Sequence, residues 1–268
     1  MRRGRRSFCA GATALAALTP AAAAARIPGL RPSVNADPFD PQPETVLQVD
    51  LPQLEYAGRW NPRPGAMREL ALEARLRTRL EPLRAPTAVK ASSPALFSTP
   101  FLYIAGEGSL PALGDVAEAR LARFLDLGGM LVFDSADGGT DRGFEHDVAA
   151  LLARIAPGTT LAPVAAEHVL FRSFYIVDAP VGRTRARPQV QGIEDEGRLK
   201  ALVIGNDLGG ALARGADGLP SHPCVPGGPA QREDAIRFAI NILLYATCTD
   251  YKSDRAHVET LLFNRRWR

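Results

Sequence analysis

The chain has 268 residues, of which 46% are hydrophobic and 23% charged, a composition typical of a globular protein. Its 32 Lys and Arg against 29 Asp and Glu give a net charge of +3, but four arginines lie in the first six residues. The remainder carries 28 basic against 29 acidic side chains, a net charge of −1. The composition therefore gives no case for a nucleic-acid-binding protein.

Residues 1–25 have the pattern of a signal peptide. A basic start precedes an alanine-rich apolar run, and small residues stand before Arg26, as at a cleavage site. Arg5-Arg6-Ser7-Phe8 resembles the twin-arginine signature, but ordinary secretion signals also carry arginines, so both export routes stay open. The apolar run is shorter than the roughly 20 residues of a membrane-spanning helix. We predict a periplasmic or secreted protein with no transmembrane segment in the mature chain.

The proline-rich residues 26–44 predict an extended leader, and residues 45–251 predict one α/β domain. At the start of this domain, a weak alternation at 46–51 predicts a strand. The leucine spacing over 67–83 predicts a long amphipathic helix. Val89 lies on a predicted short strand.

The central stretch predicts a βαβ unit. Phe101–Ala105 and Met130–Phe133 are short apolar runs, typical of strands that are buried on both faces. Between them, Asp115 and Glu118 resemble a capping box at the start of an amphipathic helix, which Gly128-Gly129 would end. Two apolar strands joined by a helix indicate a parallel pair.

The remaining elements follow in chain order. We predict a helix at 144–155, an edge strand at 161–164, a tight turn at 192–198, an apolar strand at 199–204, a long loop at 209–228, a helix from Gly228-Pro229, and an amphipathic tail at 252–268. Cys224 and Cys248 would form a disulfide in an oxidising compartment or remain two thiols, and both alternatives stay open.

Polar residues follow three of the apolar strands at the points where the strands end. These residues are Glu107, Asp134 and the pair Asn206-Asp207. The carboxyl ends of parallel strands meet at one edge of a sheet, so we predict that these residues line one ligand-binding cleft. Gathered carboxylates favour a nearby cation, so His168 or Arg198 should approach it. The alternative is that loops use Asp, Asn and Gly in any case.

Two kinds of chemistry are open to the residues at this edge. Ser135 would be a nucleophile if a base such as His168 reached it, although no Gly-x-Ser-x-Gly elbow surrounds it. The carboxylates of Glu107, Asp134 and Asp207 would suit a hard cation, but Arg198 would relieve their repulsion equally well. We predict no metal and no cofactor.

The ordered set of motifs resembles one family. The motifs are Phe101-Leu-Tyr-Ile-Ala-Gly-Glu-Gly108, Phe124-Leu-Asp-Leu-Gly-Gly-Met-Leu-Val-Phe-Asp134, Glu167-His168 with Ser173-Phe174-Tyr175, Gly192-Ile193 with Gly197-Arg198-Leu199, Asn206-Asp207-Leu208, and Ala239-Ile-Asn241-Ile242 with Tyr245-Ala246. Together, over roughly 46–251, they are similar to the bacterial domain-of-unknown-function family numbered 4159.

The resemblance implies a three-layer α/β sandwich with a mostly parallel sheet, flavodoxin-like and similar to class I glutamine amidotransferases. In those enzymes a nucleophilic cysteine follows the strand that Met130–Phe133 resembles, whereas here Asp134-Ser135 stands there. Family members often carry an aspartate at the Ser135 position and a histidine at the Glu107 position. Some are fused to membrane segments and von Willebrand factor A-like domains. We therefore expect an exported, non-catalytic binding or interaction module of the cell envelope with envelope protein partners; the alternative is a hydrolase using Ser135 with His168.

Overall fold

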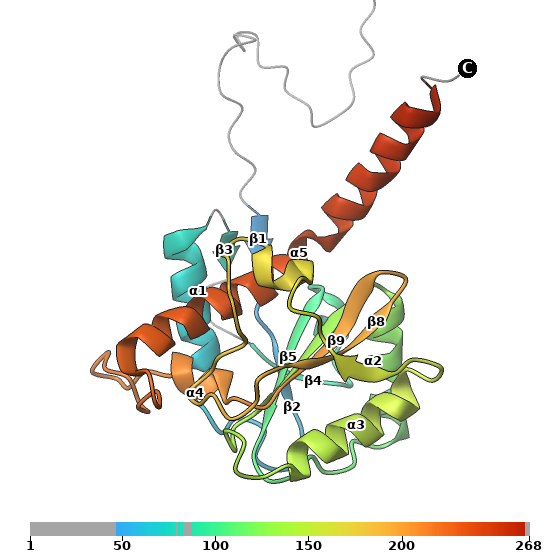
Figure 1. The fold of residues 1–268 in the computed structure, drawn as a ribbon. Helices are drawn as coiled ribbons and strands as arrows, with labels where there is room; N and C mark the ends of the chain where they lie inside the picture. Colours follow the sequence, from blue (N-terminus) through green and yellow to red (C-terminus); the bar gives the residue numbers. More distant parts are fainter. Residues whose placement is uncertain (1–46, 79, 83–86, 266–268) are drawn as a thin grey trace, which may run out of the picture. The chain divides into compact units, whose positions relative to one another are not determined.

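The computed structural model describes residues 47–78, 80–82 and 87–265, and describes side chains over 50–78, 80 and 87–247. The predicted signal peptide and leader lie outside the described residues. Seven strands form one sheet in the order β4-β2-β5-β6-β9-β8-β7 (Figure 1). The strands are β2 Gln53–Glu55, β4 Ala88–Lys90, β5 Phe101–Gly106, β6 Met130–Ser135, β7 Leu161–Pro163, β8 Gln191–Asp195 and β9 Arg198–Ile204. The first five strands in the sheet order are parallel, and β8 pairs antiparallel with both of its neighbours, β9 and β7.

Helices cover both faces of this sheet (Figure 1). One face carries α2 Asp115–Asp126 and α3 Gly143–Ile155, and the other carries α1 Ala66–Arg77, α4 Leu208–Leu212 and α5 Gly228–Arg265. Along β5, Leu102 and Ile104 pack on the α2–α3 side, whereas Phe101 and Tyr103 pack on the opposite side. The protein is thus an α/β sandwich of three layers with a mostly parallel sheet. Burial on both faces explains why the strands read as unbroken apolar runs.

The predicted βαβ unit is confirmed. β5 and β6 pair in parallel from Phe101 opposite Met130 to Gly106 opposite Ser135. Gly128 has a φ of 96° and lies just beyond α2. The predicted capping box is wrong, because Gly114 is the N-cap residue and Asp115 is already helical. Glu118 instead accepts two hydrogen bonds from Arg154 of α3, at 2.8 and 2.9 Å.

The N-terminal part of the domain differs most from the prediction. The strand predicted at 46–51 is β1 Leu47–Val49, which pairs with β3 Leu80–Pro82 in a separate two-stranded sheet. The helix predicted to reach residue 83 ends at Arg77. Thr78 is extended, and its hydroxyl donates to the Ala74 carbonyl at 2.6 Å and accepts from the Leu80 N–H at 3.1 Å. That turn directs the chain out of the helix and into β3.

Two later segments are also more regular than predicted. The turn predicted at 192–198 is mostly strand, because β8 and β9 form a hairpin through Glu196 and Gly197, whose φ angles are 51° and 74°. The loop predicted at 209–228 begins with the buried helix α4. The final helix begins as predicted and continues as α5 to Arg265, through most of the predicted tail. A short 3₁₀ helix occurs at η1 Pro94–Phe97 and another at η2 Val169–Arg172.

Cys224 is a free, buried cysteine, and Cys248 lies outside the residues whose side chains are described. None of the helices in the described part of the chain is both long and apolar enough to span a bilayer.

Candidate functional site

The strand β6 ends in a buried carboxylate. Asp134 is 1% exposed and accepts hydrogen bonds from the Tyr103 hydroxyl at 2.6 Å and from the N–H groups of Leu208 and Gly209 at 2.9 and 2.6 Å. Burial, and after it the charge of Asp207, raises the pKa of Asp134 to about 6, although the three hydrogen bonds lower it. Asp134 therefore joins β5, β6 and the first turn of α4.

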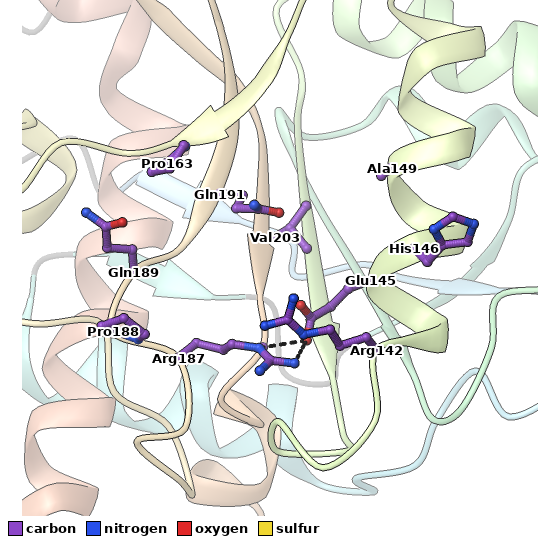
Figure 2. A pocket seen from close by; sticks show the side chains of 11 residues that line it. Arg142, Glu145, His146, Ala149, Pro163, Arg187, Pro188, Gln189, Gln191 and Val203 are labelled. Carbon is purple, nitrogen blue, oxygen red and sulfur yellow. Dashed lines mark hydrogen bonds and ion pairs between the residues drawn. The ribbon is translucent and has the colours of Figure 1, made fainter.

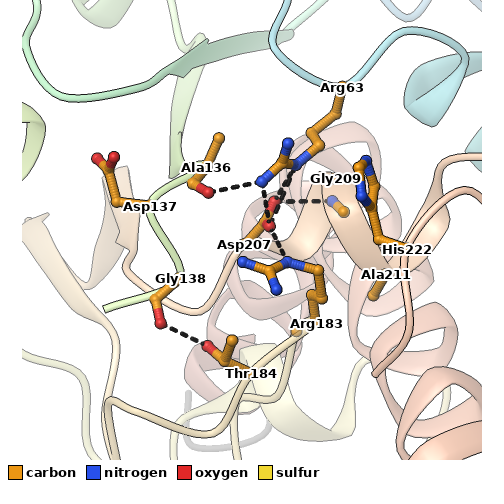
Figure 3. Close-up of polar contacts among 12 residues, drawn as sticks. Arg63, Ala136, Asp137, Gly138, Arg183, Thr184, Asp207, Gly209, Ala211 and His222 are labelled. Atoms are coloured by element: carbon orange, nitrogen blue, oxygen red, sulfur yellow. Dashed lines mark hydrogen bonds and ion pairs between the residues drawn. The ribbon is translucent and has the colours of Figure 1, made fainter. Parts of the chain in front are cut away.

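A second buried carboxylate, Asp207, lies three residues beyond β9 and holds two arginines. Arg63 donates from Nε to both carboxylate oxygens, at 2.9 and 3.1 Å, and from Nη2 to Oδ2 at 2.7 Å. Arg183 donates from Nε to Oδ2 on the opposite side (Figure 3). The side chains of Arg63 and Arg183 are 13% and 24% exposed. The buried charge of Asp207 is thus paired with two guanidiniums. The arginine side chains are the part of this ion-pair group that contacts solvent.

Two glycines allow the backbone to approach these carboxylates. A Cβ atom at Gly209 would lie 2.6 Å from the Tyr103 hydroxyl oxygen, and one at Gly210 would lie 2.4 Å from Asp207 Oδ2. The Gly210 N–H donates to Asp207 Oδ1 at 2.9 Å. Asp207 itself has a φ of 55°, a conformation that aspartate adopts more readily than most residues. The segment from Asp207 to Gly210 is therefore shaped by its contacts with the two acids.

The loop that carries Arg183 is fixed from two sides. The Asn206 amide donates to the carbonyls of Pro180 and Arg187, both at 2.8 Å, and accepts from the Arg187 N–H at 2.7 Å. The Gln231 amide of α5 donates to the carbonyls of Gly182 and Arg183 at 2.9 and 3.0 Å. The position of the Arg183 guanidinium is consequently set before any ligand binds.

Glu107 and Ser135 each have a nearby partner of their own. Glu107 forms an ion pair with Arg59 at 2.6 Å, on a surface where Arg59 is 73% exposed. The Ser135 hydroxyl donates to Asp137 at 3.1 Å, and Asp137 also accepts from the Gly108 N–H at 2.9 and 3.0 Å. These contacts connect the turns after β5 and β6.

The structure brings together some of the predicted site residues. Asp134, Asn206 and Asp207 lie at the same edge of the sheet. Burial is the largest single influence on the pKa of Arg63 and lowers it, but the hydrogen bond to Asp207 and the charges of Asp207, Asp134 and Glu107 together raise that pKa above its ordinary value. Asn206, however, directs its side chain to the 180–187 loop.

Arg198 and His168 do not approach this edge, and that prediction is wrong. Arg198 begins β9 and donates to the carbonyls of Leu125 and Gly128 at the end of α2. His168 caps η2 by accepting from the Leu170 N–H at 3.0 Å, and its ring packs on Tyr245, whose hydroxyl accepts from the Leu199 N–H. From Leu199 to Ile204 the strand rises about 17 Å, at roughly 3.3 Å per residue. Arg63 and Arg183, from loops, supply the cations instead.

A pocket of about 390 Å³ lies on the α3 side of the same edge (Figure 2). Arg142, Glu145 and His146 line it from α3 and the turn before it, and Arg187 and Gln191 line it from the opposite side. Arg187 and Glu145 form an ion pair across it at 3.2 Å. None of the acids predicted to line a cleft lines this pocket.

The sequence model of the family described as "Domain of unknown function (DUF4159)" matches residues 50–247. The chain belongs to the DUF4159 family. Comparison with curated proteins found no match. We call Asp134, Asp207 and their side-chain partners Tyr103, Arg63 and Arg183 the charged cluster. All five residues lie within the matched span. The cluster is therefore part of the DUF4159 domain itself.

Sequence reasoning missed three residues of this DUF4159 domain that build the cluster: Tyr103, Arg63 and Arg183. Tyr103 could have been found, because a hydroxyl inside a run buried on both faces needs a polar partner. The two arginines stand in irregular loops far from Asp207 in sequence, and no local pattern marks them as its partners.

Both acids of the cluster, Asp134 and Asp207, are buried and accept several hydrogen bonds, whereas the side chains of Arg63 and Arg183 are 13% and 24% exposed. Among the described residues of this DUF4159 chain, no three His, Cys, Asp or Glu side chains are grouped so as to share a metal ion.

Proposed function

We propose that the chain is an exported, non-catalytic binding or interaction module of the bacterial cell envelope. We further propose that its α/β sandwich is of the flavodoxin-like, class I glutamine amidotransferase-like kind. Where those enzymes carry a cysteine, this chain has Asp134 and Ser135, the last two residues of β6. The binding surface would be the edge formed by Asp207 and its two arginines.

One observation carries this proposal: two arginines share one buried carboxylate at this edge and still expose part of their side chains, 13% for Arg63 and 24% for Arg183. Asp207 is fully buried and receives donors from three separate segments, at Arg63, Arg183 and Gly210. Such a site is already organised, so a ligand that binds to the guanidiniums would lose little free energy in ordering them.

The hydrolase alternative lacks a base for Ser135. The Ser135 hydroxyl is bonded to Asp137, and His168 lies near the opposite end of β9. We expect broad esterase and amidase screening to give the same background for the wild type and for Ser135→Ala. Turnover that depends on Ser135 would contradict the non-catalytic proposal.

The export part of the proposal has its own test. Mass spectrometry of protein from the periplasmic fraction should find an N-terminus near Arg26. The intact chain in the cytosol, with none in the periplasm, would refute it.

The binding part is tested by capture of envelope proteins with the tagged full-length chain. We expect wild type and Arg185→Gln to retain the same envelope protein. Arg183→Gln should retain at least about fivefold less of that protein. Arg185 is a matched control, because it stands two residues away, is 47% exposed, and pairs with Asp234 at 3.6 Å. Equal capture by the wild type and both variants, or no specific capture by any of these proteins, would refute the proposed role of this edge.

A further inference from the structure

Arg183 has donors left over after it binds Asp207. Its Nε is used by the carboxylate, but its two terminal amino groups have no hydrogen-bond acceptor among the described residues. Figure 3 shows these terminal nitrogens on the side of Gly138 and Thr184. An arginine fork with two unused parallel donors matches an acceptor that has two oxygens.

The turn that faces this fork also has an unused donor. Gly138 is buried, yet its backbone N–H finds no acceptor within the part of the chain that the structure describes. A Cβ atom at Gly138 would lie 2.8 Å from Arg183 Nη2 and 2.9 Å from Thr184 Cγ2, so the turn and the guanidinium are direct neighbours. A buried N–H is normally paired, so its lack of an acceptor is notable.

The one acid in this turn does not occupy the fork. Asp137 directs its carboxylate away from the arginines in Figure 3, onto the Gly108 N–H and the Ser135 hydroxyl. The unused donors therefore lie beside a neutral stretch of backbone, next to Thr184.

The local charge favours an anion with one charge over an anion with two. Two guanidiniums stand against two carboxylates, Asp134 and Asp207, in the cluster. His222 adds no charge near neutral pH, because burial and the charge of Arg63 lower its pKa. With little excess positive charge, planar carboxylate suits the fork better than a phosphate dianion.

We infer that the Arg183 fork and the Gly138 turn bind a free carboxylate group of the ligand. This inference rests on the proposed binding function for the ligand itself, and it adds the chemical class that the edge recognises. A small carboxylic acid and the C-terminus of a peptide both present such a group, and the experiment separates them.

The test is calorimetric titration of the purified mature chain with acetate, inorganic phosphate, N-acetylated trialanine and the C-terminal amide of that peptide. We expect acetate to bind more tightly than phosphate. The affinity for the free-acid peptide should be at least about tenfold higher than the affinity for its amide. Arg183→Lys keeps the charge but loses the fork, and should weaken carboxylate binding about tenfold, while Arg185→Gln should leave it unchanged. If acetate binds and the peptide adds no affinity, a small acid is indicated; higher affinity for the peptide indicates a chain terminus.

A second variant and a stability measurement guard against a folding defect in Arg183→Lys. Arg183→Gln also removes the fork and should also weaken acetate binding, and denaturant unfolding of both variants checks that they are folded under the conditions of the titration. Tighter binding of phosphate, equal binding of the acid and the amide, or full acetate affinity in both variants would overturn the inference. If it is overturned while envelope capture still requires Arg183, the proposed function survives alone. If carboxylates bind as expected and no envelope protein is captured, only the proposed function fails.

Discussion

The two ends of the strand β9 use charged residues in different ways. At its carboxyl end, Asp207 is fully buried and two arginines bind its side chain. At its amino end, Arg198 donates to two backbone carbonyls, those of Leu125 and Gly128, where α2 ends. One end gathers charges from distant segments, whereas the other satisfies the last carbonyls of a helix.

This difference separates a binding surface from a structural cap. A guanidinium that binds helix-terminal carbonyls completes the local hydrogen bonding and complements the helix dipole. A buried carboxylate shared by two arginines from different loops joins segments far apart in sequence and still exposes part of each arginine. The predictions below test whether the ends differ in stability as well as in binding.

The largest effect is expected from Asp207→Ala. It removes the carboxylate from two partly buried guanidiniums, and breaking a buried ion pair in this way costs about 3–5 kcal/mol. Denaturant unfolding of the wild type and the variant measures the loss. A change below about 1 kcal/mol would mean that water solvates the two guanidiniums as well as Asp207 does. The two ends of β9 would then not differ in their contribution to stability.

An intermediate effect is expected from the pH dependence of Asp134. Its pKa is raised from 3.8 unfolded to about 6 folded, so the folded state binds the extra proton between these values. Its contribution to stability is therefore full below pH 4, is lost as the pH rises to about 6, and stays lost above. The change is on the order of 3 kcal/mol.

The measurement compares unfolding free energies of the wild type and Asp134→Asn from pH 4 to pH 7. The difference between the two proteins isolates this group, because carboxylates such as Glu118 and Glu233, whose pKa values are lowered by arginines, shift stability in the opposite sense in both. We expect the wild type to lose stability relative to the variant as the pH rises. A flat or rising difference would mean that the three hydrogen bonds outweigh burial.

The sequence was enough to place the acids of the site at one edge. Asp134 and Asp207 each follow an unbroken apolar run, and parallel strands bring such ends together. The fold class could be predicted for the same reason, because strands buried on both faces have a clear apolar pattern. By contrast, β2 and β3 have three residues each, too few to show a period.

The partners of the acids could not be predicted in the same way. Proximity to the carboxylates was inferred for Arg198 from charge alone, but Arg198 begins the strand that Asp207 follows and so lies at its opposite end. Arg63 and Arg183 come from loops whose course depends on tertiary contacts, such as those of Asn206 and Gln231. Charge complementarity predicts that a basic side chain lies beside the buried carboxylates. Which basic residue lies there depends on the path of the chain in the folded protein.

The smallest effect is expected from Arg198→Met, which keeps the apolar stem of the side chain but removes its donors. The carbonyls of Leu125 and Gly128 would lose their hydrogen bonds at a partly exposed helix end, where water can replace them, so about 1 kcal/mol of stability should be lost. The same titrations should show unchanged affinity for acetate, since this end of β9 lies about 17 Å from the other. A loss of stability as large as that of Asp207→Ala, or a change in acetate affinity, would show that the two ends act as one unit and that Arg198 is more than a cap for α2.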